Sequence, residues 1–199
     1  MPASESDRAL REHLLVLRAQ LGSRDAFRSL FESYQPRLLY YLRRRLGPAE
    51  AEDVLQEVWM TVLQKITRLQ NPRAFKAWIY RIAHHRAISS RRRQRDELSL
   101  DALPEGLDPT PARAVDEAEQ AFAGFPLEEV LRQLDLLAPS HREVLTLRFL
   151  EELSYAEIAE VLGRSLGTVR SRLHYAKKTL QERLSGQRPV QVQDGTHHE

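Results

Sequence analysis

Residues 154–180 read SYAEIAEVLGRSLGTVRSRLHYAKKTL and contain the most informative pattern of the chain. Ser154 and Glu157 have the S-x-x-E spacing of a capping box, which predicts that a helix begins just after the serine. Gly163 can adopt the left-handed conformation that a tight corner between two helices requires. Ser165 can cap the helix that follows. The sequence therefore predicts two consecutive helices joined by a glycine turn.

The second of these predicted helices has an apolar face and a basic face. Its apolar face is formed by Val169, Leu173, Ala176 and Leu180. Its opposite face carries Thr168, Arg170, Ser171, Arg172, His174, Tyr175 and Lys178. A helix-turn-helix presents such a helix to the major groove, where polar side chains contact base edges and cations contact phosphates. The alternative is an ordinary helical hairpin on a solvated surface, but the combination of cap, turn glycine and basic face favours DNA binding.

Charge is distributed very unevenly along the chain, although the formal net charge is only +2. Residues 58–95 contain ten basic side chains and no acidic one, whereas residues 96–135 contain eleven acids and two arginines. Residues 161–188 are basic again, with seven cations and one acid. An unevenly charged solvated surface is the alternative, but segments of one sign and this length favour a polyanionic partner.

The upstream half of the chain repeats its hydrophobic residues with a helical period. One stripe consists of Leu10, Leu14, Leu17 and Leu21. The next helix begins near Phe27 with Asp25 as its candidate N-cap, and Pro36 fits the first turn of a continuation. Further helices are expected over residues 49–67, with Trp59 on the apolar face, and from Phe75 into the arginine run. Phe75 and Trp78 could stack on DNA, but their helical spacing favours the core. No stretch alternates with period two for long enough to indicate a strand, so the predicted fold class is all-α.

The predicted fold has two small helical domains joined by an acidic, proline-containing linker, and the C-terminal domain is a helix-turn-helix. The expected divisions are an N-terminal extension (1–24), a first domain (25–95), the linker (96–125), a second domain (126–185) and a disordered tail (186–199). A short helix is also expected near residues 112–121 of the linker.

Several classes of protein are excluded by composition. The 199 residues include no cysteine, which excludes disulfides, thiolate zinc sites and a cysteine nucleophile. No apolar run approaches the ~20 residues of a membrane span, and the N-terminus lacks a signal-peptide core, so a soluble cytoplasmic protein is expected. His84 and His85 lie about 100° apart on a helix and no carboxylate is nearby, so neither a metal nor another cofactor is expected.

Four blocks of the chain, in order, resemble bacterial sigma factors. Residues 26–34 (AFRSLFESY), 51–59 (AEDVLQEVW) and 75–93 (FKAWIYRIAHHRAISSRRR) resemble the domain that binds core polymerase and melts the promoter. Residues 134–184 resemble the C-terminal domain that binds the −35 element. No room remains for a middle domain, so the chain resembles the minimal extracytoplasmic-function (ECF) group of the sigma-70 family. The resemblance implies a non-catalytic polymerase subunit that supplies promoter specificity and DNA melting.

The resemblance also implies roles for particular residues. Those expected to bind core polymerase are Asp53, Gln56 and Glu57, which share one helix face. Those expected at the −10 element are Asn71, Arg73, Lys76, Arg81, His84, His85, Arg86, Arg91 and Arg92. Those expected at the −35 element are Arg148, Ser165, Thr168, Arg170, Ser171, Arg172, His174 and Lys178. The family often has Asn and Asp where this chain has His85 and Ser89, so those two family contacts are not carried over.

The partners implied by the resemblance are core RNA polymerase, through its clamp coiled coil and flap tip, promoter DNA and an anti-sigma factor. A freestanding helix-turn-helix repressor or activator is the main alternative, but it leaves the acid-free segment without a task. A nuclease is a second alternative, yet residues 58–95 hold no carboxylate for a catalytic metal. A third is a decoy that sequesters an anti-sigma factor, which would not need an intact recognition helix.

Overall fold

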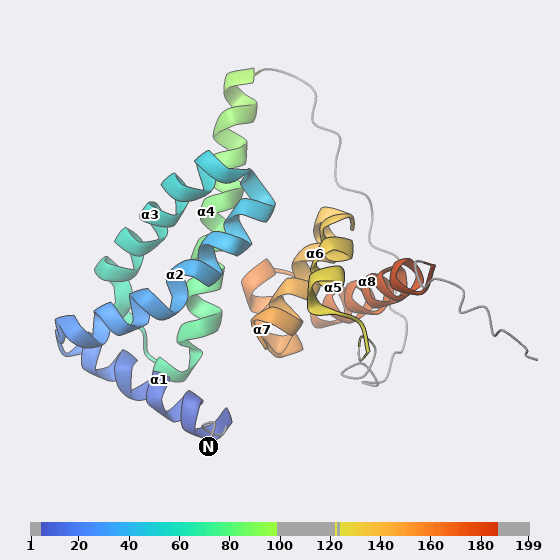
Figure 1. Ribbon diagram of the computed structural model, residues 1–199. Coiled ribbons are helices and arrows are strands. Elements are labelled where there is room, and N and C mark those ends of the chain that lie inside the picture. Colours follow the sequence, from blue (N-terminus) through green and yellow to red (C-terminus); the bar gives the residue numbers. More distant parts are fainter. Residues whose placement is uncertain (1–4, 99–121, 123, 187–199) are drawn as a thin grey trace, which may run out of the picture.

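The structure, a computed structural model, describes residues 5–98, 122 and 124–186. These residues form helices and connecting turns without a strand, which confirms the all-α prediction for them (Figure 1). The α-helices are α1 (Glu5–Gln20), α2 (Arg24–Leu46), α3 (Pro48–Lys65), α4 (Phe75–Leu98), α5 (Leu127–Asp135), α6 (Pro139–Leu145), α7 (Tyr155–Leu162) and α8 (Leu166–Gly186). The shorter segments are the 3-10 turns η1 (Ile66–Arg68) and η2 (Pro72–Ala74) and the π-helical η3 (Thr146–Leu150). The helix expected near residues 112–121 and the tail beyond 186 lie outside the described residues.

Helix α2 begins and continues differently from the sequence prediction. Its N-cap is Ser23, whose hydroxyl accepts a hydrogen bond from the Ala26 amide, so the assignment of the cap to Asp25 was wrong. Asp25 lies in the first turn, where a carboxylate favours the positive end of the helix dipole. Pro36 lies inside one uninterrupted helix rather than at the start of a second.

Helices α1 to α4 form the N-terminal domain around an aromatic and aliphatic core. Trp59 is 6% exposed and meets Phe27 edge-on at 5.9 Å between ring centroids. Tyr34 meets Phe75 in the same way at 5.4 Å. These contacts confirm Trp59 and Phe75 as core residues, as their helical spacing predicts.

The leucine stripe of α1 faces solvent, whereas its neighbouring face packs on the domain. The exposed side chains are Leu10, Leu14, Leu17 and Leu21. Val16 and Ala19 are buried against the core in their place. A helical period indicates that one face is apolar, but it does not indicate which face the neighbouring helices cover.

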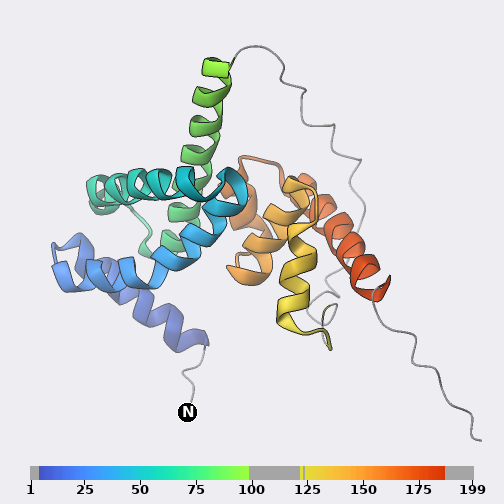
Figure 2. The ribbon, with the colours of Figure 1, turned by 45° about the horizontal axis from the view of Figure 1, so that its top comes forward.

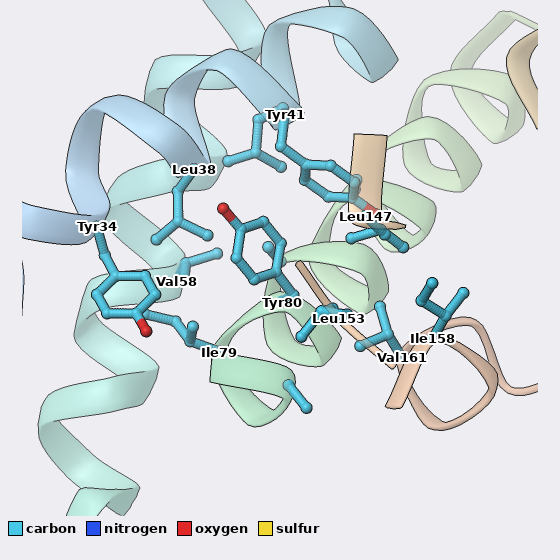
Figure 3. Close-up of a cluster of buried hydrophobic side chains, with 14 of the residues drawn as sticks. Tyr34, Leu38, Tyr41, Val58, Ile79, Tyr80, Leu147, Leu153, Ile158 and Val161 are labelled. Carbon is cyan, nitrogen blue, oxygen red and sulfur yellow. The ribbon is translucent and has the colours of Figure 1, made fainter. Parts of the chain in front are cut away.

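The second domain, α5 to α8, packs directly against the first (Figure 2). Helix α7 lies along α4, and the two hydrophobic cores join. In Figure 3, Tyr41 and Tyr80 of the first domain lie beside Leu147, Leu153 and Val161 of the second. All five side chains are 2% exposed or less. The structure is therefore a closed arrangement, in which the two domains share one core.

Candidate nucleic-acid interface

The predicted helix-turn-helix is present with the expected caps. The Ser154 hydroxyl accepts from the Glu157 amide at 3.2 Å, and the Glu157 carboxylate accepts from the Ser154 amide at 2.8 Å. Gly163 has φ 60° and ψ 37°, the left-handed conformation that glycine adopts without strain. The Ser165 hydroxyl accepts from the Thr168 amide at 3.1 Å at the start of α8. The capping box, the turn and the second cap are thus confirmed.

Removing the capping box is expected to have a measurable but limited effect. Replacing Ser154 with alanine removes a hydroxyl that caps α7 and should lower the free energy of unfolding by about 1 kcal/mol. Chemical denaturation measures this change. Ser185→Ala, at an exposed position near the end of α8, is the control and should change stability by less than about 0.5 kcal/mol. Equal effects of the two substitutions would contradict the capping role.

The outward face of α8 presents cations and hydroxyls to solvent. Of the residues predicted to contact the −35 element, Ser165, Arg170 and Lys178 are exposed. Thr168, Arg172 and His174 are half-buried on the same helix. Arg164, in the turn itself, is also exposed and was not predicted, although a cation beside the turn glycine could have indicated it.

Two predicted −35 residues have structural partners instead of a free surface position. Ser171 is 1% exposed and its hydroxyl donates to the Thr168 carbonyl at 3.0 Å, so the prediction that it faces DNA requires correction. Its position on the helix lies between the basic face and the packed face, which periodicity alone did not separate. Arg148 donates to the Leu153 carbonyl at 3.3 Å, and its guanidinium lies 5.5 Å from the ring centre of Tyr155. These contacts of Arg148 stabilise the start of α7.

The predicted −10 residues lie along the connection between α3 and α4 and along α4 itself. Asn71 caps η2, where its side-chain oxygen accepts from the Arg73 amide at 3.1 Å. Both of these residues are exposed, and so are four of the predicted residues on α4: Arg81, His85, Arg91 and Arg92. Lys76 is half-buried and lies 3.9 Å from the Glu152 carboxylate of the second domain.

A cavity of about 290 Å³ opens between α3 and α4. Its lining consists of Thr61, Lys65, Trp78, Arg81, Ile82, His85 and Arg86. Burial, together with the neighbouring His84 and Arg81, lowers the pKa of His85 from its ordinary value of 6.5, which favours the neutral ring. A neutral imidazole can donate one hydrogen bond and accept another. The cavity thus combines cations, an indole ring and a group that can both donate and accept a hydrogen bond. Four of its residues, Thr61, Lys65, Trp78 and Ile82, were not predicted as site residues, and the helical spacing of Trp78 and Ile82 favours a place in the core.

His84 differs from the other predicted −10 residues because the second domain covers it. It is 7% exposed, and its Nδ1 lies 2.9 Å from the Glu143 carboxylate, so the expectation that no carboxylate lies near this histidine was wrong. The prediction that His84 tracks the DNA backbone therefore does not hold in the closed arrangement. Its neighbour His85 points away on the exposed side of α4, because consecutive residues of a helix face different directions.

The face predicted to bind polymerase lies on α3. Asp53 and Gln56 are exposed, as a docking face requires. Glu57 is half-buried, and its carboxylate lies 3.3 Å from both Arg86 and Arg93 of α4. Its ion pairs therefore link α3 to α4. Two apolar side chains extend this surface of α3: Met60 is 60% exposed and Leu63 is 59% exposed. The sequence analysis did not single them out, although their helical spacing from Gln56 could have indicated them.

The contact between the domains contains two carboxylates removed from water. Glu151 is 2% exposed and lies 2.6 Å from the Arg37 guanidinium. Glu143 accepts from the Tyr41 hydroxyl at 2.6 Å and pairs with Arg45 and His84. Burial alone would raise the pKa of Glu143, but the hydrogen bond from His84 and the charge of Arg45 outweigh it and lower the pKa to about 2.

Two negative findings complete the description. Within the described residues, histidine, aspartate and glutamate side chains do not gather in groups of three that could hold a metal ion. No helix in the described part of the chain is both long and apolar enough to cross a membrane.

The chain is similar in sequence to known proteins. Residues 30–97 match the family model "Sigma-70 region 2", and residues 127–180 match "Sigma-70, region 4". The RNA polymerase sigma factor YlaC of Bacillus subtilis (strain 168) is 36% identical over 171 residues, which cover 83% of this chain and 95% of that protein. The ECF RNA polymerase sigma factor SigW of the same organism is 31% identical over 176 residues, with 85% and 94% covered.

The fold is also found among solved structures. The sigma factor RpoE from Bartonella quintana, in complex with the anti-sigma factor NepR, matches with a TM-score of 0.60 at 24% identity. The match covers 81% of this chain and 98% of that one. Two helical domains, one carrying a helix-turn-helix, and the matched relatives together define the class: the chain belongs to the sigma-70 family of RNA polymerase sigma factors, in its ECF group.

Proposed function

We propose that this chain is an ECF sigma factor that binds core RNA polymerase in the cytoplasm and directs it to promoters. The observation that carries this proposal is the presence of two basic, exposed faces of different kinds on one chain. One is the face of α8, which suits duplex DNA, and the other is the cavity between α3 and α4. A freestanding repressor needs only the first of these.

The face of α8 is proposed to read the −35 element from the major groove. Arg170 and Arg164 are placed to contact bases or phosphates, and Lys178 to contact the flanking backbone. Phosphate contacts give the affinity its dependence on salt, whereas base contacts give the sequence preference.

The cavity beside α4 is proposed to hold an unstacked base of the −10 element. Proteins that bind single-stranded nucleic acid combine cations for the backbone with aromatic rings on which bases stack. Arg81 and Lys65 supply cations and Trp78 the ring, while neutral His85 can hydrogen-bond to a base edge. Arg91 and Arg92, further along α4, are placed to follow the displaced strand.

Core polymerase is proposed to dock on α3 through Asp53 and Gln56, with Met60 and Leu63 as apolar neighbours. Each DNA-reading face is small, so the polymerase raises the effective concentration of one face once the other has bound. We also propose regulation by an anti-sigma factor, because the solved structure of RpoE, which shares this fold, is a complex with the anti-sigma factor NepR.

Run-off transcription tests the proposal. Core polymerase is incubated with fragments of the genome that encodes this chain, with and without the protein. The expected result is initiation at discrete sites only when the protein is present. Initiation that does not change when the protein is added would overturn the proposal.

A further inference from the structure

The side chain of Gln20, the last residue of α1, is bound to the connection between α3 and α4. Its amide nitrogen donates to the Ile66 carbonyl at 2.9 Å and to the Leu69 carbonyl at 2.7 Å. Both carbonyls lie a few residues before Asn71 and Arg73, the exposed residues at the tip of this connection. One amide thus holds two points of a segment that is 46 to 49 residues away in the sequence.

The other hydrogen bonds of this connection are short-range. The Leu69 amide donates to the Ile66 carbonyl at 3.1 Å, and the Ala74 amide donates to the Asn71 carbonyl at 3.0 Å. Such bonds shape each turn but do not fix the turns relative to the rest of the domain. The amide of Gln20 supplies a tie to a different helix, and α1 packs against both η1 and η2.

Helix α1 precedes the segment that the family model describes, which begins at residue 30. We infer that Gln20 is a positioning residue that holds the connection in the shape required to discriminate among the bases of the −10 element. This inference rests on the proposed function, with Asn71 and Arg73, exposed on the connection beside the cavity, as further residues that contact the −10 bases. A connection already held in its bound shape loses less conformational entropy on binding, and a fixed shape rejects a wrong base more strongly than a mobile one.

Two substitutions of similar size remove the donors without removing the side chain. Gln20→Met is uncharged, whereas Gln20→Glu places a carboxylate against two carbonyl oxygens. Gln35→Met, at another half-buried glutamine on α2, is the matched control. The holoenzyme is assayed for initiation on the promoter found by run-off transcription, with each of the four bases at every −10 position.

For each −10 position, the ratio between the initiation rates with the best and the worst base should fall by about tenfold in both Gln20 variants. This magnitude corresponds to the loss of two hydrogen bonds of ordinary strength. Binding to a −35 duplex and to core polymerase should not change, and Gln35→Met should keep the full ratio. Hydrogen exchange of the backbone amides of Leu69, Asn71, Arg73 and Ala74 in the free protein should accelerate by about tenfold in Gln20→Met.

Three outcomes would overturn the inference. An unchanged ratio in both Gln20 variants would show that discrimination does not depend on the tie. A parallel loss of −35 binding, polymerase binding and thermal stability would show a merely structural role. If the wild-type protein does not support initiation, both the proposed function and this inference are overturned. If the wild-type protein supports initiation and the Gln20 variants keep its ratio between bases, the inference alone is overturned.

Discussion

Replacing Arg37 with alanine is expected to separate the two domains. The substitution leaves the Glu151 carboxylate, which is 2% exposed in the closed arrangement, without the guanidinium 2.6 Å away. An uncompensated buried charge costs about 3–5 kcal/mol, and opening the contact lets water reach the carboxylate. The chain has no cysteine, so cysteines introduced at Gln64 on α3 and Ser185 on α8 can be labelled for energy transfer between the domains. The efficiency of energy transfer should fall to the value expected for two separated domains.

The control for Arg37 is Arg43 on the same helix. Arg43 pairs with Glu52 at 2.8 Å, but both side chains are about half exposed, at 48% and 58%. An exposed pair contributes less than about 1 kcal/mol, so Arg43→Ala should leave energy transfer unchanged. If both substitutions change energy transfer equally, the buried pair does not hold the domains together.

Acidification is expected to weaken the same contact through Glu143. The pKa of this carboxyl in the folded protein is about 2, below the ordinary value of 4.5, because the hydrogen bond from His84 and the charge of Arg45 outweigh burial. A lowered pKa stabilises the folded form above the ordinary value and loses that effect as the pH falls toward 2. The stabilisation, about 3 kcal/mol at neutral pH, should therefore disappear between pH 5 and pH 2.

Denaturation measured across that pH range tests this prediction. Glu143→Gln has no carboxyl to protonate, so its stability should change less than that of the wild type between pH 5 and pH 2. If the stabilities of the two proteins depend on pH in the same way, other carboxylates cause the acid sensitivity.

Local patterns were sufficient to predict the helix-turn-helix. The capping box of Ser154, the left-handed Gly163 and the cap at Ser165 are all interactions between residues close in sequence. Their physical causes can be seen in the sequence itself. The same holds for core positions such as Trp59, which follow from helical spacing.

Features that depend on packing between distant segments could not be predicted in this way. His84 pairs with Glu143, 59 residues away, and that contact turns a predicted DNA contact into part of the interface between domains. Helix α1 covers the core with Val16 and exposes the leucine stripe, because the fit of the neighbouring helices decides which face is buried. Ser171 lies at the edge between two faces, where helical periodicity is least informative.

The structure also refines which substitutions test polymerase binding. Glu57 braces Arg86 and Arg93, so replacing it would disturb α4 as well as the docking face. Asp53 and Gln56 are exposed, and their joint replacement by alanine changes only the surface of α3. Glu32→Ala with Gln35→Ala on α2 is the matched control, because it removes the same kinds of side chain at the same spacing.

The most direct test of the proposed sigma function measures strand opening at the promoter that run-off transcription identifies. The permanganate reactivity of unpaired thymines reports this opening. Reactivity around the −10 element should appear only when core polymerase and this protein are both present. The Asp53→Ala/Gln56→Ala variant should need a concentration at least about tenfold higher than the wild type to give the same reactivity, because central interface residues are lost. The α2 control variant should need the same concentration as the wild type. Tight binding of duplex DNA by the protein alone, with no strand opening when polymerase is added, would contradict the sigma function and indicate a repressor.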